Sequence, residues 1–222
     1  MARMCGKFAQ MSSWSELVTL GDLIAAPCDD VQTVTPMRLA TVITLDDEGH
    51  RCAVKMRWGM VARHATDPMS GTKHIHARAE TIDTLPTFRE AFAHRRGLVA
   101  VSTFNEGKEI TPTKTEQHVI TPRDRKPLAI AVIWERWTSH NAGELLTFAM
   151  VTVPANPLIA TITDRMPAVI AADDWGTWLG ENDASVEALK AVLKPFDGDW
   201  DMRTQAKTKP PPKPGSAQAE LF

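Results

Sequence analysis

The feature that most constrains the fold of this chain is a series of β-rich runs joined by connections of irregular length. Apolar and β-branched residues alternate or cluster in five segments, which are residues 39–45, 50–58, 98–104, 128–134 and 145–153. Asp46 to Gly49 supply turn residues between the first two segments, which predicts a hairpin. The other connections lack a regular helical spacer, so mixed or antiparallel pairing is favoured over a doubly wound sheet.

Helical patterns are few and short. A capping box opens residues 13–25, in which leucines follow at helical spacing. Pro86 suits the first turn of a second helix, which is expected to hold Arg95 and Arg96 in its last turn and to end before Gly97. Two further short helices and one extended segment are predicted, at residues 174–179, 184–193 and 74–80 respectively.

The length of 222 residues, with 43% hydrophobic and 23% charged residues, is typical of one globular domain. From Lys207 the chain becomes rich in lysine and proline, so residues 1–206 are predicted to form the domain and residues 207–222 a flexible tail. The net charge of -2 excludes a globally basic nucleic-acid binder but allows a local basic groove.

Cysteine usage and hydropathy indicate the compartment. Cys5, Cys28 and Cys52 form no Cys-x-x-Cys pair, and their odd number argues against a disulfide framework. No apolar run approaches the length of about 18 residues that a membrane span needs, and the N-terminus lacks the apolar segment of a signal peptide. We therefore expect a cytoplasmic protein without a membrane partner.

Cys5 has the most distinctive chemistry because it directly follows Met4. A free cysteine is usually a small buried apolar residue. As the first residue of a mature chain, however, it would carry an α-amine and a thiol with reference pKa values of about 8 and about 8.5. The amine can attack an aldehyde, and the thiol can close on the imine to form a thiazolidine. This chemistry requires a start at Met4 or cleavage after it, because removing Met1 alone would expose Ala2.

Two pairs of residues have the spacing that places both side chains on one face of a strand. They are His50 with Cys52 and His74 with His76. The two pairs could supply four zinc ligands, but nothing else in the sequence supports a metal site. We therefore predict neither a metal nor another cofactor.

Several charged and aromatic residues are candidates for chemistry or binding. Glu106 comes just beyond a predicted strand, where a carboxylate can act as general acid or base if burial raises its pKa. Arg57, Arg78 and Arg165 could bind phosphate, and Trp58 could stack on a base. Each of these residues, taken alone, also has an ordinary structural explanation.

Six segments gain meaning from their order along the chain. They are Met4 to Phe8, Arg57 to Gly59, His76 to Thr81, Arg95 to Glu106, Ala155 to Ile159 and Thr163 to Pro167. In this order they resemble the SOS-response-associated peptidase (SRAP) family, the abasic-site-processing proteins. The first segment is similar to the family's opening Met-Cys-Gly-Arg-Phe, and the last to its His-Asp-Arg-Met-Pro. The resemblance runs from about residue 4 to residue 170.

The resemblance implies a single α+β domain with a mixed, mainly antiparallel, barrel-like sheet and flanking helices. It implies that Cys5 condenses with the ring-opened aldehyde of an abasic site in single-stranded DNA and forms a stable thiazolidine crosslink. Glu106 would be the acid/base group, Arg78 would hold phosphate beside the lesion, and Trp58 would lie near the DNA. Single-stranded DNA is thus the expected partner, with no obligate protein partner, and the protein would associate with the nucleoid when bound to DNA.

The family name also implies a peptidase activity, which we expect to be self-processing that exposes Cys5. Met1 to Arg3 would then be an extension that the family does not share. A start at Met4 would make the chain begin where family members begin.

Two catalytic positions depart from the family pattern. The family asparagine that helps to position the cysteine is His76 here, and the family histidine that serves proton transfer and crosslink reversal is Thr163. A threonine hydroxyl does not titrate near neutral pH as imidazole does. We therefore expect either that His76 takes over part of the proton transfer or that crosslinks form and reverse poorly.

Two other functions are consistent with the same residues. A chain that lacks the family histidine could bind single-stranded DNA without chemistry. Alternatively, the protein could be a cysteine-dependent peptidase that acts on other proteins, although no histidine occupies the family position that would activate the thiol.

Overall fold

The structure is a computed structural model of the chain, and it describes residues 6–10, 33–139 and 143–205. The predictions for the helix at residues 13–25, for the tail from Lys207 and for Cys5 lie outside these residues.

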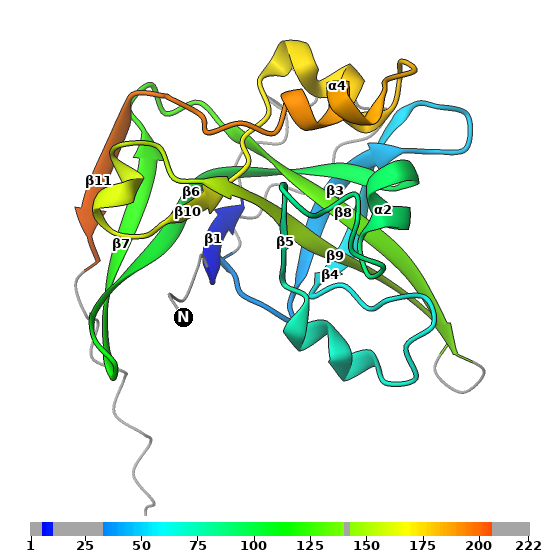
Figure 1. Cartoon of the computed structure of the whole chain (residues 1–222), viewed down its shortest axis with the longest axis horizontal. Helices are drawn as coiled ribbons and strands as arrows, with labels where there is room; N and C mark the ends of the chain where they lie inside the picture. Colours follow the sequence, from blue (N-terminus) through cyan, green and yellow to red (C-terminus); the bar gives the residue numbers. More distant parts are fainter. Residues whose placement is uncertain (1–5, 11–32, 140–142, 206–222) are drawn as a thin grey trace, which may run out of the picture.

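Five strands of one large sheet close into a ring (Figure 1). They are β3 (Leu39–Leu45), β4 (Arg51–Trp58), β6 (Arg96–Thr111), β8 (Leu128–Ser139) and β9 (Gly143–Pro154). Strand β3 pairs antiparallel with β4 and β6, β6 with β8, and β8 with β9, while β9 returns to β4 in parallel. The β3–β6 and β4–β9 junctions are short, so the ring is not a complete barrel.

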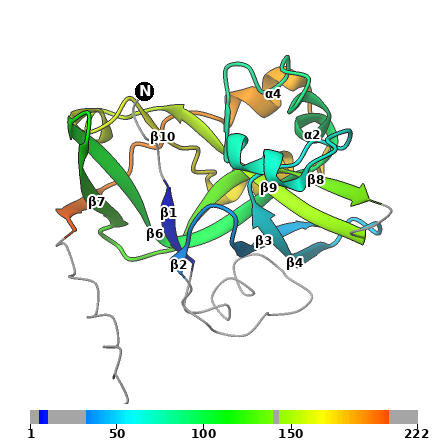
Figure 2. The same ribbon diagram turned by 90° about the horizontal axis from the view of Figure 1, so that it is seen from below.

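Strands β6 and β9 extend beyond the ring, and the other strands of the sheet are added next to these extensions. The second half of β6 pairs with β1 (Lys7–Gln10) and β7 (Lys114–Pro122). The second half of β9 pairs with β5 (His76–Arg78) and β10 (Arg165–Pro167). Outer strands β2 (Thr33–Val34) and β11 (Trp200–Thr204) pair with β1 and β7 respectively. Strand β1 lies between β7 and β9 in both views (Figures 1 and 2).

Helices α2 (Arg89–His94) and α4 (Val186–Ala191) lie at the end of the molecule away from β7 and β11 (Figure 2). The α-helices are α2 (Arg89–His94), α3 (Trp175–Leu179) and α4 (Val186–Ala191), and the 3-10 helices are η1 (Pro68–Lys73), η2 (Ile159–Thr161) and η3 (Ala172–Asp174). Among the described residues no helix is both long and apolar enough to cross a membrane.

The burial pattern of the strands follows from how the helices pack. The ring portions of β6 and β8 are buried at consecutive residues, because α2 and α3 pack on their outer face while their inner face lines the core. Strand β7 has no such cover and buries alternate residues, His118, Ile120 and Pro122. The core therefore fills the ring and continues along the inner face of β7.

The predicted fold class is confirmed: the chain is one α+β domain with a large, mixed, mainly antiparallel sheet that closes into a ring. The strands predicted at residues 39–45, 128–134 and 145–153 are present, and the run at 50–58 forms a strand from Arg51. The run at 98–104 is only part of β6. The described strands that were not predicted from the sequence are β1, β2, β7, β10 and β11.

The prediction for the helix that starts at Pro86 was wrong at both ends. Helix α2 begins at Arg89, and Arg95 closes it, so that Arg96 and Gly97 open strand β6. Gly97 is required by packing: a Cβ there would lie 2.6 Å from Val42 Cγ1 and 2.9 Å from Ile43 O. The predicted extended segment 74–80 is a strand only over β5, and helices predicted at 174–179 and 184–193 are confirmed as the shorter α3 and α4.

Candidate functional site

Glu106 lies inside strand β6, and the prediction that it follows the strand was wrong. Strand β6 continues to Thr111 because the hairpin with β7 extends the pairing beyond the ring. Glu106 is directly opposite His118 of β7, and only 1% of Glu106 is exposed. Side chains of such a cross-strand pair lie on the same face of the sheet. A buried carboxylate and a buried imidazole are thus neighbours on the inner face.

Strand β1 brings the start of the described chain to the strand that carries Glu106. Lys7 is paired with Asn105 and Phe8 with Phe104, so the antiparallel register directs the preceding residues toward Glu106. Phe8 is fully buried, and its ring centroid is 5.1 Å from that of Trp58. Cys5 itself lies outside the described residues.

Trp58 is completely buried, so its ring is not presented to solvent as a surface for base stacking. The indole is packed by Phe8 on β1 and by Phe148 on β9, and the imidazole of His76 meets it edge-on with 6.0 Å between ring centroids. Its Nε1–H donates to the Ile75 carbonyl over 2.8 Å. Trp58 therefore holds the backbone directly before His76 through this hydrogen bond and contacts the His76 ring.

The neighbours of Trp58 fix the adjoining loop. The Arg57 Nη2 group donates to the Pro68 carbonyl over 2.5 Å, and burial lowers the pKa of the Arg57 guanidinium. Gly59 has a φ of +123°, and a Cβ at this position would lie 2.8 Å from the Gly71 carbonyl oxygen. The Arg57-Trp58-Gly59 segment thus holds both η1 and the chain that leads into β5.

Arg78 and Arg165 lie on strands that flank β9, but they differ in availability. Arg78 of β5 is exposed. Arg165 of β10 is 8% exposed, and its guanidinium donates to the Glu80 carboxylate and to the Thr152 carbonyl. The hydrogen bond from Arg165 keeps the pKa of Glu80 below its ordinary value. Arg78 is accordingly the arginine of this pair that is open to a ligand.

Thr163 is buried between η2 and β10, with 6% of its surface exposed. Within the described residues its Oγ1 atom has no hydrogen-bond partner. The loop before it is held by Asn156, which accepts from the Ile159 amide and donates to the Phe196 carbonyl. The position that carries a histidine in the resembled pattern is thus a buried hydroxyl in this chain.

The two residue pairs considered for zinc lie apart. Cys52 is at the start of β4 and His50 directly precedes this strand, whereas His76 packs on Trp58 at the end of the same strand. Burial, together with the charge of Asp46, raises the pKa of the Cys52 thiol. The described part of the chain holds no group of three or more histidine, cysteine, aspartate or glutamate side chains arranged to bind a metal.

The structure therefore connects some of the predicted residues and separates others. Phe8 and Trp58 link the β1–β6 pair, which carries Glu106, to His76 on β5. Arg78 and Arg165 lie along the outer half of β9. His118 was missed because strand β7 was missed. The available sequence signal was the β-branched run from Val119 to Thr121 directly after His118.

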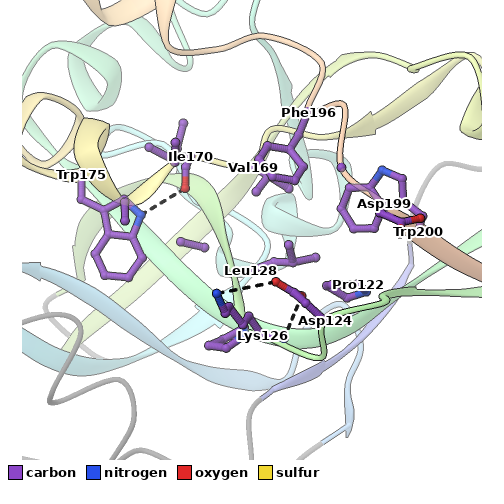
Figure 3. Close-up of a pocket in the computed structure, with 15 residues that line it drawn as sticks. Pro122, Asp124, Lys126, Leu128, Val169, Ile170, Trp175, Phe196, Asp199 and Trp200 are labelled. Atoms are coloured by element: carbon purple, nitrogen blue, oxygen red, sulfur yellow. Dashed lines mark hydrogen bonds and ion pairs between the residues drawn. The ribbon is translucent and has the colours of Figure 1, made fainter.

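A separate cavity of about 470 Å³ lies where the β7–β8 turn meets the segment after β10 and the start of β11. Figure 3 shows Trp175, Phe196 and Trp200 around it, with the Lys126–Asp124 ion pair at its edge. None of the predicted site residues lines this cavity. Two residues that line it, Leu128 and Ala129, pair directly with Val101 and Ala100 of β6, the strand that carries Glu106.

Comparison with known proteins gives a consistent set of relatives. Residues 4–208 match the family described as SOS response associated peptidase (SRAP). The chain is 30% identical over 223 residues to the abasic site processing protein YoaM of Bacillus subtilis (strain 168), which covers 99% of this chain and 97% of that protein. The abasic site processing protein YoqW of the same organism is 28% identical over 200 residues, 88% of this chain and 89% of YoqW.

The fold also has a solved counterpart. A crystal structure of a protein from Bacteroides thetaiotaomicron superimposes with a TM-score of 0.75, at 22% identity, over 90% of this chain and 91% of that one. At this level of identity the match concerns the fold alone.

Proposed function

The chain belongs to the SOS-response-associated peptidase (SRAP) family, and we propose that it captures abasic sites in single-stranded DNA covalently through Cys5. The relatives YoaM and YoqW are named abasic site processing proteins, which supplies the substrate class. The observation that carries the proposal is the register of β1 on β6. This register leads the start of the chain to the strand that holds the buried Glu106.

Chain connectivity limits how far Cys5 can be from this carboxylate. Lys7 lies opposite Asn105, the residue before Glu106. Cys5 comes two residues before Lys7 in the sequence, and two residues of extended chain span at most about 7 Å. A nucleophile carried at that position is within reach of an aldehyde that is bound beside Glu106.

The proposed reaction releases one water molecule. The neutral α-amine of Cys5 adds to the aldehyde carbon of the ring-opened sugar, and one amine proton passes to the oxygen to form a hydroxyl. Loss of this hydroxyl with the second amine proton gives an imine and water. The thiol sulfur then adds to the imine carbon while its proton passes to nitrogen, which closes the thiazolidine. Glu106 would supply the proton to the leaving hydroxyl and accept one from the attacking group.

The arginines divide between binding and support in this proposal. The exposed Arg78 would contact the phosphate beside the lesion. Arg165 and Arg57 are engaged by Glu80 and by the Pro68 carbonyl, so we assign them to positioning the walls of the DNA site. Trp58 would act in the same way, because its ring supports the backbone before His76.

His76 is the proposed substitute at the family asparagine position. It is half-buried on β5 and packs on the edge of Trp58, close to the strand that follows Cys5. If His76 takes part in proton transfer, a His76→Ala variant will form and reverse crosslinks more slowly than the parent. If the variant matches the parent in both rates, His76 has no such role.

Self-processing that exposes Cys5 is part of the proposal, since the α-amine must be free. Intact mass spectrometry of the purified protein will show whether the chain begins at Cys5. A preparation that retains residues ahead of Cys5 would be unable to form a thiazolidine and would serve as its own negative control.

The central experiment incubates the protein with an oligonucleotide that carries one abasic site and separates the products on a denaturing gel. We expect a slowly migrating band that is absent in Cys5→Ser and absent with an oligonucleotide lacking the lesion. Cys52→Ser is the matched thiol control and should react like the parent, because burial raises the pKa of the Cys52 thiol.

The alternatives give different results in the same assay. A band that persists in Cys5→Ser would show that another group is the nucleophile. A chain that begins at Cys5, binds the oligonucleotide and gives no band would instead be a DNA-binding module without chemistry. Cleavage of added proteins in a Cys5-dependent manner would indicate a peptidase that acts in trans.

A further inference from the structure

We propose that His118 is the positioning residue that keeps Glu106 in its working protonation state. This inference rests on the proposed function and concerns the same site. His118 lies outside every segment that resembles the family pattern, and its place next to the catalytic carboxylate follows from the pairing of β6 with β7.

The register gives the first argument. Glu106 and His118 are directly opposite in an antiparallel pair, so their Cβ atoms are about 4.5–5.5 Å apart and their side chains lie on one face. That face is the inner one, because the flanking pair Phe104 and Ile120 is fully buried. An imidazole and a carboxylate at this separation can exchange a proton directly or through one water molecule.

The burial of His118 gives the second argument. Only 8% of the residue is exposed, although it belongs to a strand that has an open outer face. An apolar residue at this position would cost less to bury than a polar ring. A titratable side chain that is buried against a catalytic carboxylate is therefore a candidate for a functional role.

One other carboxylate lies near the ring. His118 Nε2 is 3.1 Å from Oε1 of Glu116, two residues earlier on the same strand, but this contact is not a hydrogen bond, and Nε2 has no hydrogen-bond partner among the described residues. Lys108 on β6 and Glu116 lie on the same face as Glu106 and His118, whereas Asp201 and Arg203 of β11 pair with Thr121 and Val119 and so lie on the opposite face. The Nε2 atom therefore remains available to serve Glu106.

The proposed proton path is balanced without any further reactant. When Glu106 has given its proton to the leaving hydroxyl, His118 as imidazolium returns a proton to the carboxylate. When the iminium that remains loses the second amine proton to give the imine, this proton passes back to the imidazole. His118 therefore acts through Glu106 and makes no contact with the DNA.

The first test compares single-turnover crosslinking of the parent with His118→Gln, which keeps a hydrogen-bonding side chain but cannot titrate. We expect the maximal rate at saturating abasic oligonucleotide to fall about tenfold or more, while the half-saturating DNA concentration changes less than about twofold. His94→Gln, at an exposed histidine at the end of α2, is the matched control and should react like the parent.

Two further measurements separate a proton-transfer role from a structural one. In a Glu106→Gln background, His118→Gln should lower the rate less than about twofold, because the two residues act as one unit. In His118→Ala, added imidazole should restore part of the lost rate in a concentration-dependent manner. Thermal melting of each variant will identify any loss that arises from unfolding.

The outcomes distinguish the two levels of the proposal. If the parent crosslinks and folded His118→Gln reacts at the parental rate, the role of His118 is refuted while the proposed function stands. The role of His118 is also refuted if His118→Gln lowers the crosslinking rate by the same factor in the Glu106→Gln background as in the parent. It is refuted as well if added imidazole does not restore the rate of a folded His118→Ala protein. If the parent with a free Cys5 α-amine forms no crosslink, the proposed function and the role of His118 are refuted together.

Discussion

The Glu80 carboxylate is held by the Arg165 guanidinium, with 2.9 Å between Nη2 and Oε2. The two residues are 85 positions apart and belong to different segments of the family pattern, which the pair joins at the outer half of β9. Arg165 also donates to the Thr152 carbonyl over 2.7 Å. The pair thus fixes the chain after β5 against β9 and β10, where Arg78 emerges.

Substitution of Glu80 will change how stability depends on pH. The hydrogen bond from Arg165 lowers the pKa of Glu80 below its ordinary value of 4.5, so the pair stabilises the fold above that pH and is lost as the pH falls through the folded-state pKa. Glu80→Gln should cost at most about 1 kcal/mol at pH 7, since the side chain is 47% exposed.

Urea unfolding of the parent and of Glu80→Gln at pH 7 and at pH 3 will check this prediction. The difference between the two proteins should shrink at pH 3, because this pH is below the ordinary pKa of 4.5, where the stabilisation that comes from the lowered pKa begins to be lost. A difference that grows on acidification would contradict the sign of the pKa shift.

Substitution of Arg78 should weaken DNA binding without affecting stability. The side chain is exposed on β5, so Arg78→Ala should leave the melting temperature unchanged. Loss of one phosphate contact to a single strand should reduce the slope of log affinity against log salt by about 0.7. Fluorescence anisotropy with a labelled oligonucleotide over a salt series measures both quantities.

Arg89→Ala on α2 provides the matched control for Arg78, because Arg89 is equally a surface arginine but lies on a helix away from β5. It should leave both affinity and slope unchanged. Equal effects of the two substitutions would mean that binding depends on total charge and that Arg78 has no specific contact.

Substitution of Trp58 should destabilise the protein and loosen the chain before His76. Trp58→Phe removes the donor to the Ile75 carbonyl and leaves a space beside Phe8 and Phe148. The free energy of unfolding should fall by about 1–3 kcal/mol, because the Ile75 carbonyl loses its donor and the smaller ring leaves a space.

Trp134→Phe is the comparison for Trp58, because that indole is only half-buried and donates to the Thr44 side chain. In denaturant unfolding, Trp134→Phe should lower the free energy of unfolding by clearly less than Trp58→Phe. If the two variants are equally stable, the buried hydrogen bond to Ile75 contributes no more than an accessible one.

Substitution of Gly59 should be more damaging than substitution of another left-handed glycine. Gly59→Ala combines a φ of +123° with a Cβ that would lie 2.8 Å from the Gly71 carbonyl oxygen. Gly49 has a φ of +83°, and a Cβ there would have no neighbouring atom within 4 Å, so Gly49→Ala carries only the backbone strain. That strain lowers the free energy of unfolding by about 1–3 kcal/mol. Gly59→Ala should lower it by more, as measured by equilibrium unfolding. Similar costs for both variants would show that the loop around Gly71 yields easily.

Several properties could be predicted from the sequence because they depend on neighbouring residues. Alternation and turn residues predicted the β3–β4 hairpin, and the order of short segments predicted the family. The prediction failed where one strand changes partners. The β6 strand pairs with β8 in its first half and with β1 and β7 in its second, and neither partner is apparent from the run that forms β6 itself.

The same limit explains the errors at single residues. Gly97 has the position of a glycine after a helix, yet its small size is required by Val42 and Ile43, which are distant in the chain. Arg96 was expected within the helix, but from β6 it donates to the Phe92 and Ala93 carbonyls at the end of α2. Trp58 was considered as a ring that could stack on a base, but the ring is buried because β1 and β9 cover it.

The sequence by itself determined the class of fold and the family, since these depend on residue types and their order. Only the tertiary structure decided that Glu106 is inside a strand and opposite His118, and that Arg165 is held by Glu80 while Arg78 is exposed. The physical reason is that strand register and burial depend on contacts between distant segments, and such contacts leave no periodic signal in either segment alone.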